Sequence, residues 1–249
     1  DVTDLALAID EGTDWVALSF VRSPHDKEVV DAILKEKGVD VPVMAKIEKW
    51  EALEHLDEII NTFDGVMVAR GDLGVEIPQE QVPLVQKRII AQANKAGKPV
   101  VIATQLLENM VENPTPTRAE ISDIANAIFD GTDALLVTGE TAIGKFPEKV
   151  IEVLSKVVLE TEQTIDFDNI HQPISHQQHT ADAISHATCQ IASDMDIGVI
   201  LTLTHSGSTA RMIARYKPSA DIIALTPVEK TYRQLSVIWG VTPNLIDQY

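Results

Sequence analysis

Short apolar runs alternate along the first two thirds of the chain with longer stretches whose apolar residues recur at helical spacing. The runs are rich in β-branched residues and predict buried strands, and the stretches between them predict amphipathic helices. Repeated strand-then-helix units indicate a parallel sheet, which can belong to a (β/α)8 TIM barrel or to an open doubly wound sheet. The predicted strands are Trp15–Val21, Val43–Ile47, Gly65–Ala69, Pro99–Ala103 and Ala134–Val137.

Two of the predicted helices carry start signals. Ser23 followed by Pro24 predicts an N-cap and a first helical residue. Thr117, with Glu120 three residues later, predicts a capping box. The chain opens on a helical stretch, Val2–Asp10, with no strand before it. If the fold is a barrel, we therefore expect about five of its eight strands here and three to be absent from the N-terminal side.

The pattern changes between residues 161 and 180, where Pro173 and a cluster of histidines and glutamines interrupt the helical spacing. We predict a domain boundary there, which separates residues 1–164 from residues 165–249. The linker histidines are interpreted as solvated rather than metal-ligating; they are His171, His176 and His179.

The second part predicts a small α/β domain in which helices and strands alternate. Its expected elements are a helix at Ala181–Asp194, a strand at Gly198–Leu203, a helix at Ser208–Tyr216, a strand at Asp221–Leu225, a helix at Val228–Leu235 and an apolar run near Val241.

Composition narrows the class of protein. The chain has 249 residues, 45% of them hydrophobic, which is enough for one large α/β domain and a smaller one. A net charge of −18 argues against a nucleic-acid or acidic-membrane surface, so a phosphate ligand would need local contacts. The single cysteine, Cys189, excludes an internal disulfide and fits a reducing cytoplasm. No apolar run approaches the roughly 18 residues of a membrane span.

The strongest candidate chemistry lies at Lys46 and Glu48, which share one face of a predicted strand because side chains alternate along a strand. Alone, the two residues would be interpreted as a structural ion pair. Asp72 follows the next strand in a glycine-flanked turn, and two carboxylates with a lysine at neighbouring strand ends would hold a hard cation such as Mg²⁺. The lysine would then stabilise a developing phosphoryl or enolate charge.

Two further strand ends carry candidates with two interpretations each. Thr104, with Gln105 beside it, is either a helix cap or a hydroxyl that contacts substrate. Glu140 has the equivalent place after the following strand, and a structural role and a site role are equally favoured.

A segment of the second domain combines hydroxyls and a glycine at the start of a predicted helix, which suits either a phosphate cradle or a plain capped turn. Its residues are Thr204, His205, Ser206, Gly207, Ser208 and Thr209.

These segments together resemble pyruvate kinase over nearly the whole length of the chain. The matching stretches are Ala17–Arg22, Lys46–Glu48, Met67–Pro78, Gly97–Pro99, Ala103–Gln105, Glu112–Glu120 and Gly139–Ala142. The resemblance implies a partial TIM barrel followed by a small three-layer α/β regulatory domain. It also implies that the first three barrel strands, the inserted lid domain and the last C-terminal strands are missing.

The resemblance implies roles for the site residues. Glu48 and Asp72 would bind Mg²⁺, for which Mn²⁺ can substitute, and Lys46 would be the catalytic lysine beside the transferred phosphoryl group. Gly71, Asp72 and Thr104 would contact the carboxylate end of phosphoenolpyruvate, Thr104 also being catalytic. The phosphoryl group would pass to ADP, and the enolate would be protonated to pyruvate.

The resemblance also implies a setting. The complete enzyme would act in glycolysis in the cytoplasm as a homotetramer and would need K⁺, whose ligands lie outside this chain. The segment Thr204–Thr209 would bind a phosphorylated effector. The chain departs from the family at Lys49, where Asn is usual, at Thr115 and Thr138, and at His205 and Ser208, where members that bind a sugar bisphosphate often have basic residues.

Two alternatives remain open at this point. One is a Mg²⁺-dependent barrel lyase that acts on pyruvate enolates. The other is a non-catalytic fragment that binds a phosphorylated metabolite or serves as a scaffold. We expect the isolated chain to have little or no full kinase activity.

Overall fold

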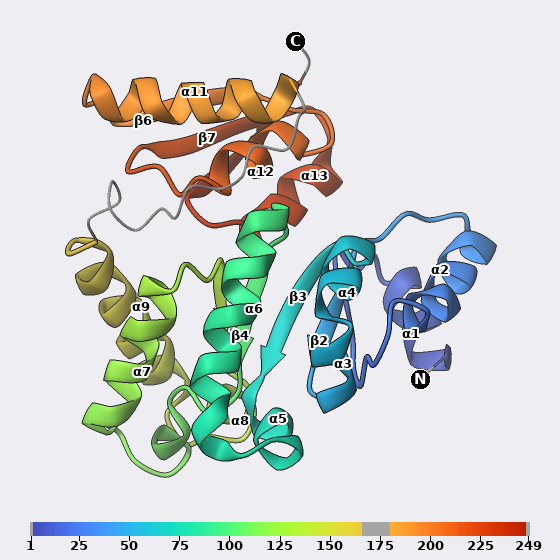
Figure 1. The fold of residues 1–249 in the computed structure, drawn as a ribbon, viewed down its shortest axis with the longest axis vertical. Coiled ribbons are helices and arrows are strands. Elements are labelled where there is room, and N and C mark those ends of the chain that lie inside the picture. Colours follow the sequence, from blue (N-terminus) through green and yellow to red (C-terminus); the bar gives the residue numbers. More distant parts are fainter. Residues whose placement is uncertain (1, 166–179, 248–249) are drawn as a thin grey trace. The chain divides into compact units, whose positions relative to one another are not determined.

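The computed structural model describes residues 2–165 and 180–247 (Figure 1). The backbone falls into two compact units, which are described separately below. The first comprises Asp1–Leu106 with Leu135–Gly139, and the second comprises Leu107–Ala134 with Glu140–Tyr249. Among the described residues, no helix has the length and apolar character needed to cross a bilayer.

The first unit is built on a sheet whose strands follow the order of the sequence, β1-β2-β3-β4-β5. The first four strands pair in parallel, with Lys46 opposite Met67 and Val68 opposite Ile102. The strands are β1 (Val16–Leu18), β2 (Val43–Ile47), β3 (Gly65–Ala69), β4 (Val100–Ala103) and β5 (Ala134–Leu136). The predicted parallel α/β sheet is therefore confirmed, with its strands in sequence order as in a partial TIM barrel.

Strand β1 is shorter than the predicted Trp15–Val21. Ser19 and Phe20 form a turn, and Phe20 has a positive φ of 58°. The backbone N–H of Phe20 donates to the Glu48 carboxylate rather than to a strand partner, so the ladder stops at Leu18.

The helices of this unit follow the strands as predicted. They are α1 (Val2–Asp10), α2 (Asp26–Lys37), α3 (Trp50–Glu54), α4 (Leu56–Thr62), α5 (Arg70–Glu76), the 3-10 turn η1 (Gln79–Gln81) and α6 (Val82–Ala96). Helix α6 packs against β3 and β4 and buries Ile89, Ile90 and Ala93 there. Gly97 ends this helix with a φ of 68°, and its N–H donates to a carbonyl of the last turn.

The start predicted for α2 is wrong. The helix begins at Asp26, not at Pro24, and Ser23 does not cap it. The Asp26 carboxylate instead accepts the backbone N–H groups of Arg22 and Ser23 at 2.7 and 2.8 Å. Residues 23–25 therefore form a turn held by an acidic side chain, and the helix starts two residues later than predicted.

The second unit contains a helical part and a three-stranded α/β part. Its elements are η2 (Glu108–Val111), α7 (Arg118–Phe129), α8 (Gly139–Ala142), α9 (Pro147–Glu162), α11 (Thr180–Asp194), β6 (Val199–Leu203), α12 (Ser208–Ala214), β7 (Asp221–Thr226), α13 (Glu229–Gln234), η3 (Leu235–Val237) and β8 (Val241–Leu245). The capping box predicted for α7 is confirmed: Thr117 Oγ1 accepts from the Glu120 N–H, and Glu120 accepts from the Thr117 N–H.

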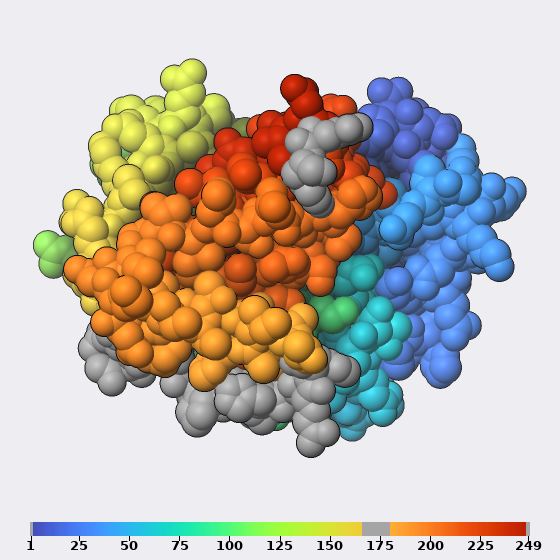
Figure 2. Space-filling view, turned by 90° about the horizontal axis from the view of Figure 1, so that it is seen from above, coloured from blue at the N-terminus to red at the C-terminus, as the bar shows by residue number. Residues whose placement is uncertain are grey.

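The α/β part has the parallel order β6-β7-β8, with Ile200 opposite Ile222 and Ile222 opposite Val241. One face of this sheet joins α11, α12 and η3 in a single core, to which Ala192, Ile213 and Leu235 contribute. Helix α11 lies within the orange surface in Figure 2. The predicted alternation of helices and strands is confirmed, and the apolar run near Val241 is strand β8.

A buried ion pair links the helical part of the second unit to its α/β part. Lys217 Nζ lies 2.7 Å from Asp133 Oδ1, and both side chains are more than nine-tenths buried. The Trp239 N–H donates to the same carboxylate oxygen, and the Trp239 ring centroid lies 5.2 Å from Lys217 Nζ. Burial lowers the pKa of Lys217, although the charge of Asp133 opposes that shift.

The domain boundary near residues 161–180 stays a prediction. Most of that segment lies outside the described residues, as do the linker histidines His171, His176 and His179.

Candidate active site

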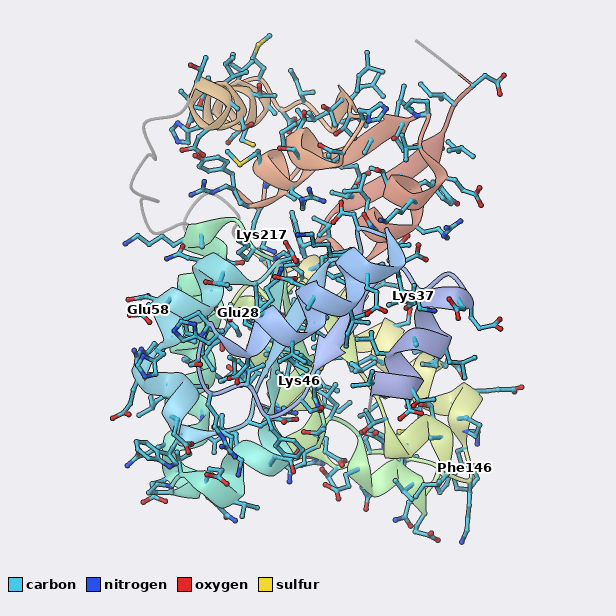
Figure 3. The ribbon with its side chains drawn as sticks, turned by 90° about the vertical axis from the view of Figure 1, so that its right-hand side faces the viewer. Glu28, Lys37, Lys46, Glu58, Phe146 and Lys217 are labelled. Atoms are coloured by element: carbon cyan, nitrogen blue, oxygen red, sulfur yellow. The ribbon has the colours of Figure 1, made fainter. Side chains whose placement is uncertain are left out.

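The site begins with an ion pair at the carboxyl end of β2. Lys46 Nζ lies 2.5 Å from Glu48 Oε1 and also donates to Ser19 Oγ at 2.9 Å. Glu48 is fully buried, whereas about a quarter of the Lys46 side chain is exposed. The sequence prediction that these two side chains share one face of the strand is therefore confirmed. Lys46 is labelled in Figure 3.

The second oxygen of the Glu48 carboxylate is held by the backbone. The Phe20 N–H donates to Glu48 Oε2 at 2.8 Å, from the turn that follows β1. Burying a carboxylate is costly unless it is paired and hydrogen-bonded, and here an ammonium and a backbone N–H provide both. Glu48 is thus an ionic group fixed between the ends of β1 and β2.

The third component joins the ends of β3 and β4. The Gly71 N–H donates to Thr104 Oγ1 at 2.9 Å. Thr104 and Gln105 both have positive φ values, 69° and 54°, which non-glycine residues rarely adopt. The buried guanidinium of Arg70 donates to the carbonyls of both residues at 2.8 and 2.9 Å. Arg70 therefore holds an unusual backbone conformation that presents the Thr104 hydroxyl to Gly71.

Asp72 lies in the first turn of α5, directly after β3, and its side chain is exposed. Because β2 and β3 are neighbours in parallel register, Glu48 and Asp72 follow adjacent strand ends. The Gly71 N–H, one residue before Asp72, is bonded to Thr104 in this structure.

The donor set suits a hard divalent cation. Glu48 Oε1 is buried and, apart from the ion-pair contact with Lys46, accepts no hydrogen bond of regular geometry among the described residues. Those residues contain no cluster of three or more histidine, cysteine, aspartate or glutamate side chains arranged for a metal. Two carboxylates with remaining positions left to water or substrate oxygens are what Mg²⁺ usually accepts. Both side chains are oxygen donors of that kind, with Glu48 buried and Asp72 exposed.

Glu140 has a structural contact in the second unit. It is 2% exposed, and its Oε1 accepts the Leu107 N–H at 3.0 Å. Of the two roles left open for this residue, the structure supports an anchor for the segment that follows β4.

The segment Thr204–Thr209 links β6 to α12. Gly207 has a φ of 78°, and a Cβ there would approach the Arg211 guanidinium to 2.9 Å. Arg211 donates to the Ser206 carbonyl at 3.0 Å, and Thr231 Oγ1 donates to the His205 carbonyl at 2.9 Å. Thr204 and Gly207 are buried, and the remaining side chains of the segment are exposed: His205, Ser206, Ser208 and Thr209.

Sequence reasoning misses four residues in the first site. It assigns no role to Arg70, to Ser19 or to the ion pair between Lys49 and Glu76. A charged residue directly after an apolar run is the signal that could have identified Arg70. The Lys49–Glu76 pair gives no local signal because it joins residues 27 positions apart.

Comparisons with known proteins agree with this geometry. Residues 1–151 match the family model described as pyruvate kinase, barrel domain, and residues 182–249 match pyruvate kinase, alpha/beta domain. Pyruvate kinase 2 of Synechocystis sp. is 48% identical over 99% of this chain and 41% of its own length. The pyruvate kinase of Thermotoga maritima is 51% identical over 94% of this chain and 50% of its own length.

A solved structure gives the same result. The crystal structure of a pyruvate kinase from Cryptosporidium parvum matches with a TM-score of 0.95 and 38% identity, covering all of this chain and 52% of that one. The chain thus spans about half the length, or less, of the relatives it matches. The two family matches together cover most of its residues, and the chain belongs to the pyruvate kinase family.

Proposed function

We propose that this chain carries the half of a pyruvate kinase active site that binds phosphoenolpyruvate. In the complete enzyme, the phosphoryl group of phosphoenolpyruvate passes to ADP and the enolate is protonated to pyruvate. The observation that supports this most strongly is the Lys46–Glu48 ion pair at the end of β2, beside the strand that leads into Gly71 and Asp72.

Each residue has a defined task in this proposal. Glu48 and Asp72 hold Mg²⁺ or Mn²⁺, which when bound neutralises charge on the substrate oxygens. Lys46 presents its ammonium to the phosphoryl group and then to the enolate, stabilising the charge that develops on each. Gly71, Asp72 and Thr104 bind the carboxylate end of the substrate, and the Thr104 hydroxyl passes a proton. Arg70 keeps Thr104 in place.

The remaining assignments concern the complete enzyme. ADP and ATP are its nucleotides and K⁺ its monovalent cation, with ligands outside this chain. It acts in glycolysis in the cytoplasm as a homotetramer. Family membership supports these assignments.

The reaction class is tested by incubating the chain with phosphoenolpyruvate and Mg²⁺, with and without ADP, and measuring pyruvate and ATP. We expect any pyruvate to require ADP and to disappear in Lys46→Met, while Lys35→Met, at an exposed lysine on α2, leaves the rate unchanged. Consumption of phosphoenolpyruvate without ADP would instead indicate the barrel lyase, and turnover that survives Lys46→Met would refute the assignment of Lys46.

We also propose that the segment Thr204–Thr209 binds a phosphorylated effector. Its exposed hydroxyls at Ser206, Ser208 and Thr209 support this, because hydroxyl donors suit phosphate oxygens. Calorimetry with sugar phosphates should detect binding that Ser206→Ala weakens and Ser219→Ala, at an exposed serine after α12, does not. Equal binding by both variants would place the ligand elsewhere. Binding of an effector without enolisation chemistry would favour the scaffold alternative.

A further inference from the structure

Lys49 connects the three segments that hold the proposed metal-binding carboxylates. Its Nζ lies 2.5 Å from Glu76 Oε1 and 5.8 Å from the centre of the Phe20 ring. Lys49 directly follows Glu48, and the backbone N–H of Phe20 holds the Glu48 carboxylate. About three quarters of each side chain in the Lys49–Glu76 pair is buried, so solvent screens this pair less than a surface ion pair.

Glu76 places this contact on the helix that carries the second carboxylate. Asp72 and Glu76 are four residues apart in α5 and therefore lie on the same side of that helix. The Lys49–Glu76 pair thus ties the Asp72 side of α5 to the chain immediately after Glu48.

We propose that Lys49 is a positioning residue that fixes the spacing of Glu48 and Asp72 and so raises the affinity of the site for a divalent cation. This rests on the proposed function, since it assumes that these two carboxylates bind the metal. Outer contacts that orient metal ligands typically contribute about 10- to 100-fold to metal affinity, and Lys49 acts through the backbone and through a helix, so we expect about tenfold.

The sign of the effect separates positioning from simple electrostatics. A lysine ammonium near a cation site repels the cation, so replacing Lys49 with a neutral residue would tighten binding if charge alone mattered. If Lys49 holds the ligands in place, the same replacement weakens binding. Lys49→Met therefore gives opposite results under the two explanations, whereas Glu76→Gln weakens binding under both.

The experiment measures binding of Mn²⁺ to the 249-residue chain by electron paramagnetic resonance. We expect Lys49→Met to weaken Mn²⁺ binding about tenfold and Lys49→Arg to keep most of the parental affinity. The double variant Lys49→Met/Glu76→Gln should bind Mn²⁺ no more weakly than Lys49→Met does, because both changes break the same ion pair. The matched control is Lys37→Met, which breaks the Lys37–Asp10 pair, also between residues 27 positions apart, and should leave binding unchanged. Thermal unfolding without metal should show that Lys49→Met and Lys37→Met are both folded at the temperature of the binding measurement.

The outcomes distinguish this inference from the proposed function. If the parent chain binds Mn²⁺ and Asp72→Ala abolishes binding, the result supports the proposed metal site. Tighter or unchanged Mn²⁺ binding by Lys49→Met would then refute only the positioning role of Lys49. If Asp72→Ala binds Mn²⁺ as well as the parent chain does, or if the parent chain binds none, both are refuted. If Lys49→Met loses affinity only because it has unfolded, the melting curve shows this. The test then rests on Lys49→Arg, provided that this variant is folded: parental affinity supports the positioning role.

Discussion

The Thr104 hydroxyl accepts the backbone N–H of Gly71 at 2.9 Å, although the two residues are 33 positions apart in the chain. This contact fastens the start of α5 to the segment after β4. Arg70, the neighbour of Gly71, donates to the carbonyl of Thr104 and so strengthens the same junction. Gly71 and Thr104, two of the three residues proposed to bind the substrate carboxylate, thus belong to one hydrogen-bonded unit.

We predict that Thr104→Val destabilises the chain by about 1 kcal/mol, because it removes the acceptor of the Gly71 N–H while keeping the branched shape of the side chain. Thr104→Ser keeps the hydroxyl and should have parental stability within a few tenths of a kcal/mol. Urea unfolding followed by circular dichroism measures both. Equal midpoints for the valine and serine variants would show that the bond contributes nothing.

The sequence predicts those parts of the site that depend on periodicity. Alternation along a strand places Lys46 and Glu48 on one face, and the parallel order of strands brings Asp72 and Thr104 to neighbouring strand ends. Neither argument needs information about distant contacts. The same holds for the capping box at Thr117, whose two partners are three residues apart.

The parts that the sequence does not predict depend on long-range contacts. The positive φ values of Thr104 and Gln105 are maintained by Arg70, more than thirty positions away. The turn at Phe20 depends on the Glu48 carboxylate, which accepts its N–H. The helix start predicted at Ser23 is wrong because the Asp26 carboxylate holds a turn there. Each local pattern is ambiguous until a distant side chain decides between its conformations.

We predict that Asp133→Asn destabilises the second unit by about 3–5 kcal/mol at neutral pH, because it leaves the buried Lys217 ammonium without its carboxylate. Burial lowers the pKa of Lys217 below the ordinary lysine value, and the substitution should lower it further. Between the lowered and the ordinary pKa, the unfolded chain binds more protons than the folded chain, so stability rises with pH.

The loss of stability caused by Asp133→Asn should therefore shrink as pH rises through the lowered pKa of Lys217. Above that pKa the side chain is a neutral amine, which needs no counter-ion. Urea unfolding of the parent chain and the variant at several alkaline pH values tests this. A difference that stays constant or grows with pH would contradict a buried, charged Lys217.

We predict that Cys189 resists alkylation in the folded chain. It is 8% exposed, and burial raises the pKa of its thiol to about 12, so the reactive thiolate is scarce below that pH. Iodoacetamide at mildly alkaline pH, followed by mass spectrometry, should label Cys189 only after urea is added. Rapid and complete labelling of the folded chain would show that this part of the core around Cys189 is open.

We predict that Thr117→Ala costs about 1 kcal/mol of stability, because it removes one half of the capping box of α7. Thr115→Ala, at an exposed residue two positions earlier, is the matched control and should change stability by less than about 0.5 kcal/mol. Chemical unfolding compares the two. Equal losses would mean that the cap adds nothing in this context.

The central claim is that Lys46, Glu48, Asp72 and Thr104 form a working half-site for enolate chemistry. The most direct measurement is Mg²⁺-dependent exchange of solvent deuterium into the methyl group of pyruvate, followed by NMR, because this partial reaction needs a metal, a lysine and a route for the proton but no nucleotide. We predict exchange by the parent chain that disappears in Asp72→Ala. Exchange that persists in Asp72→Ala, or its absence from the folded parent chain, would contradict the claim.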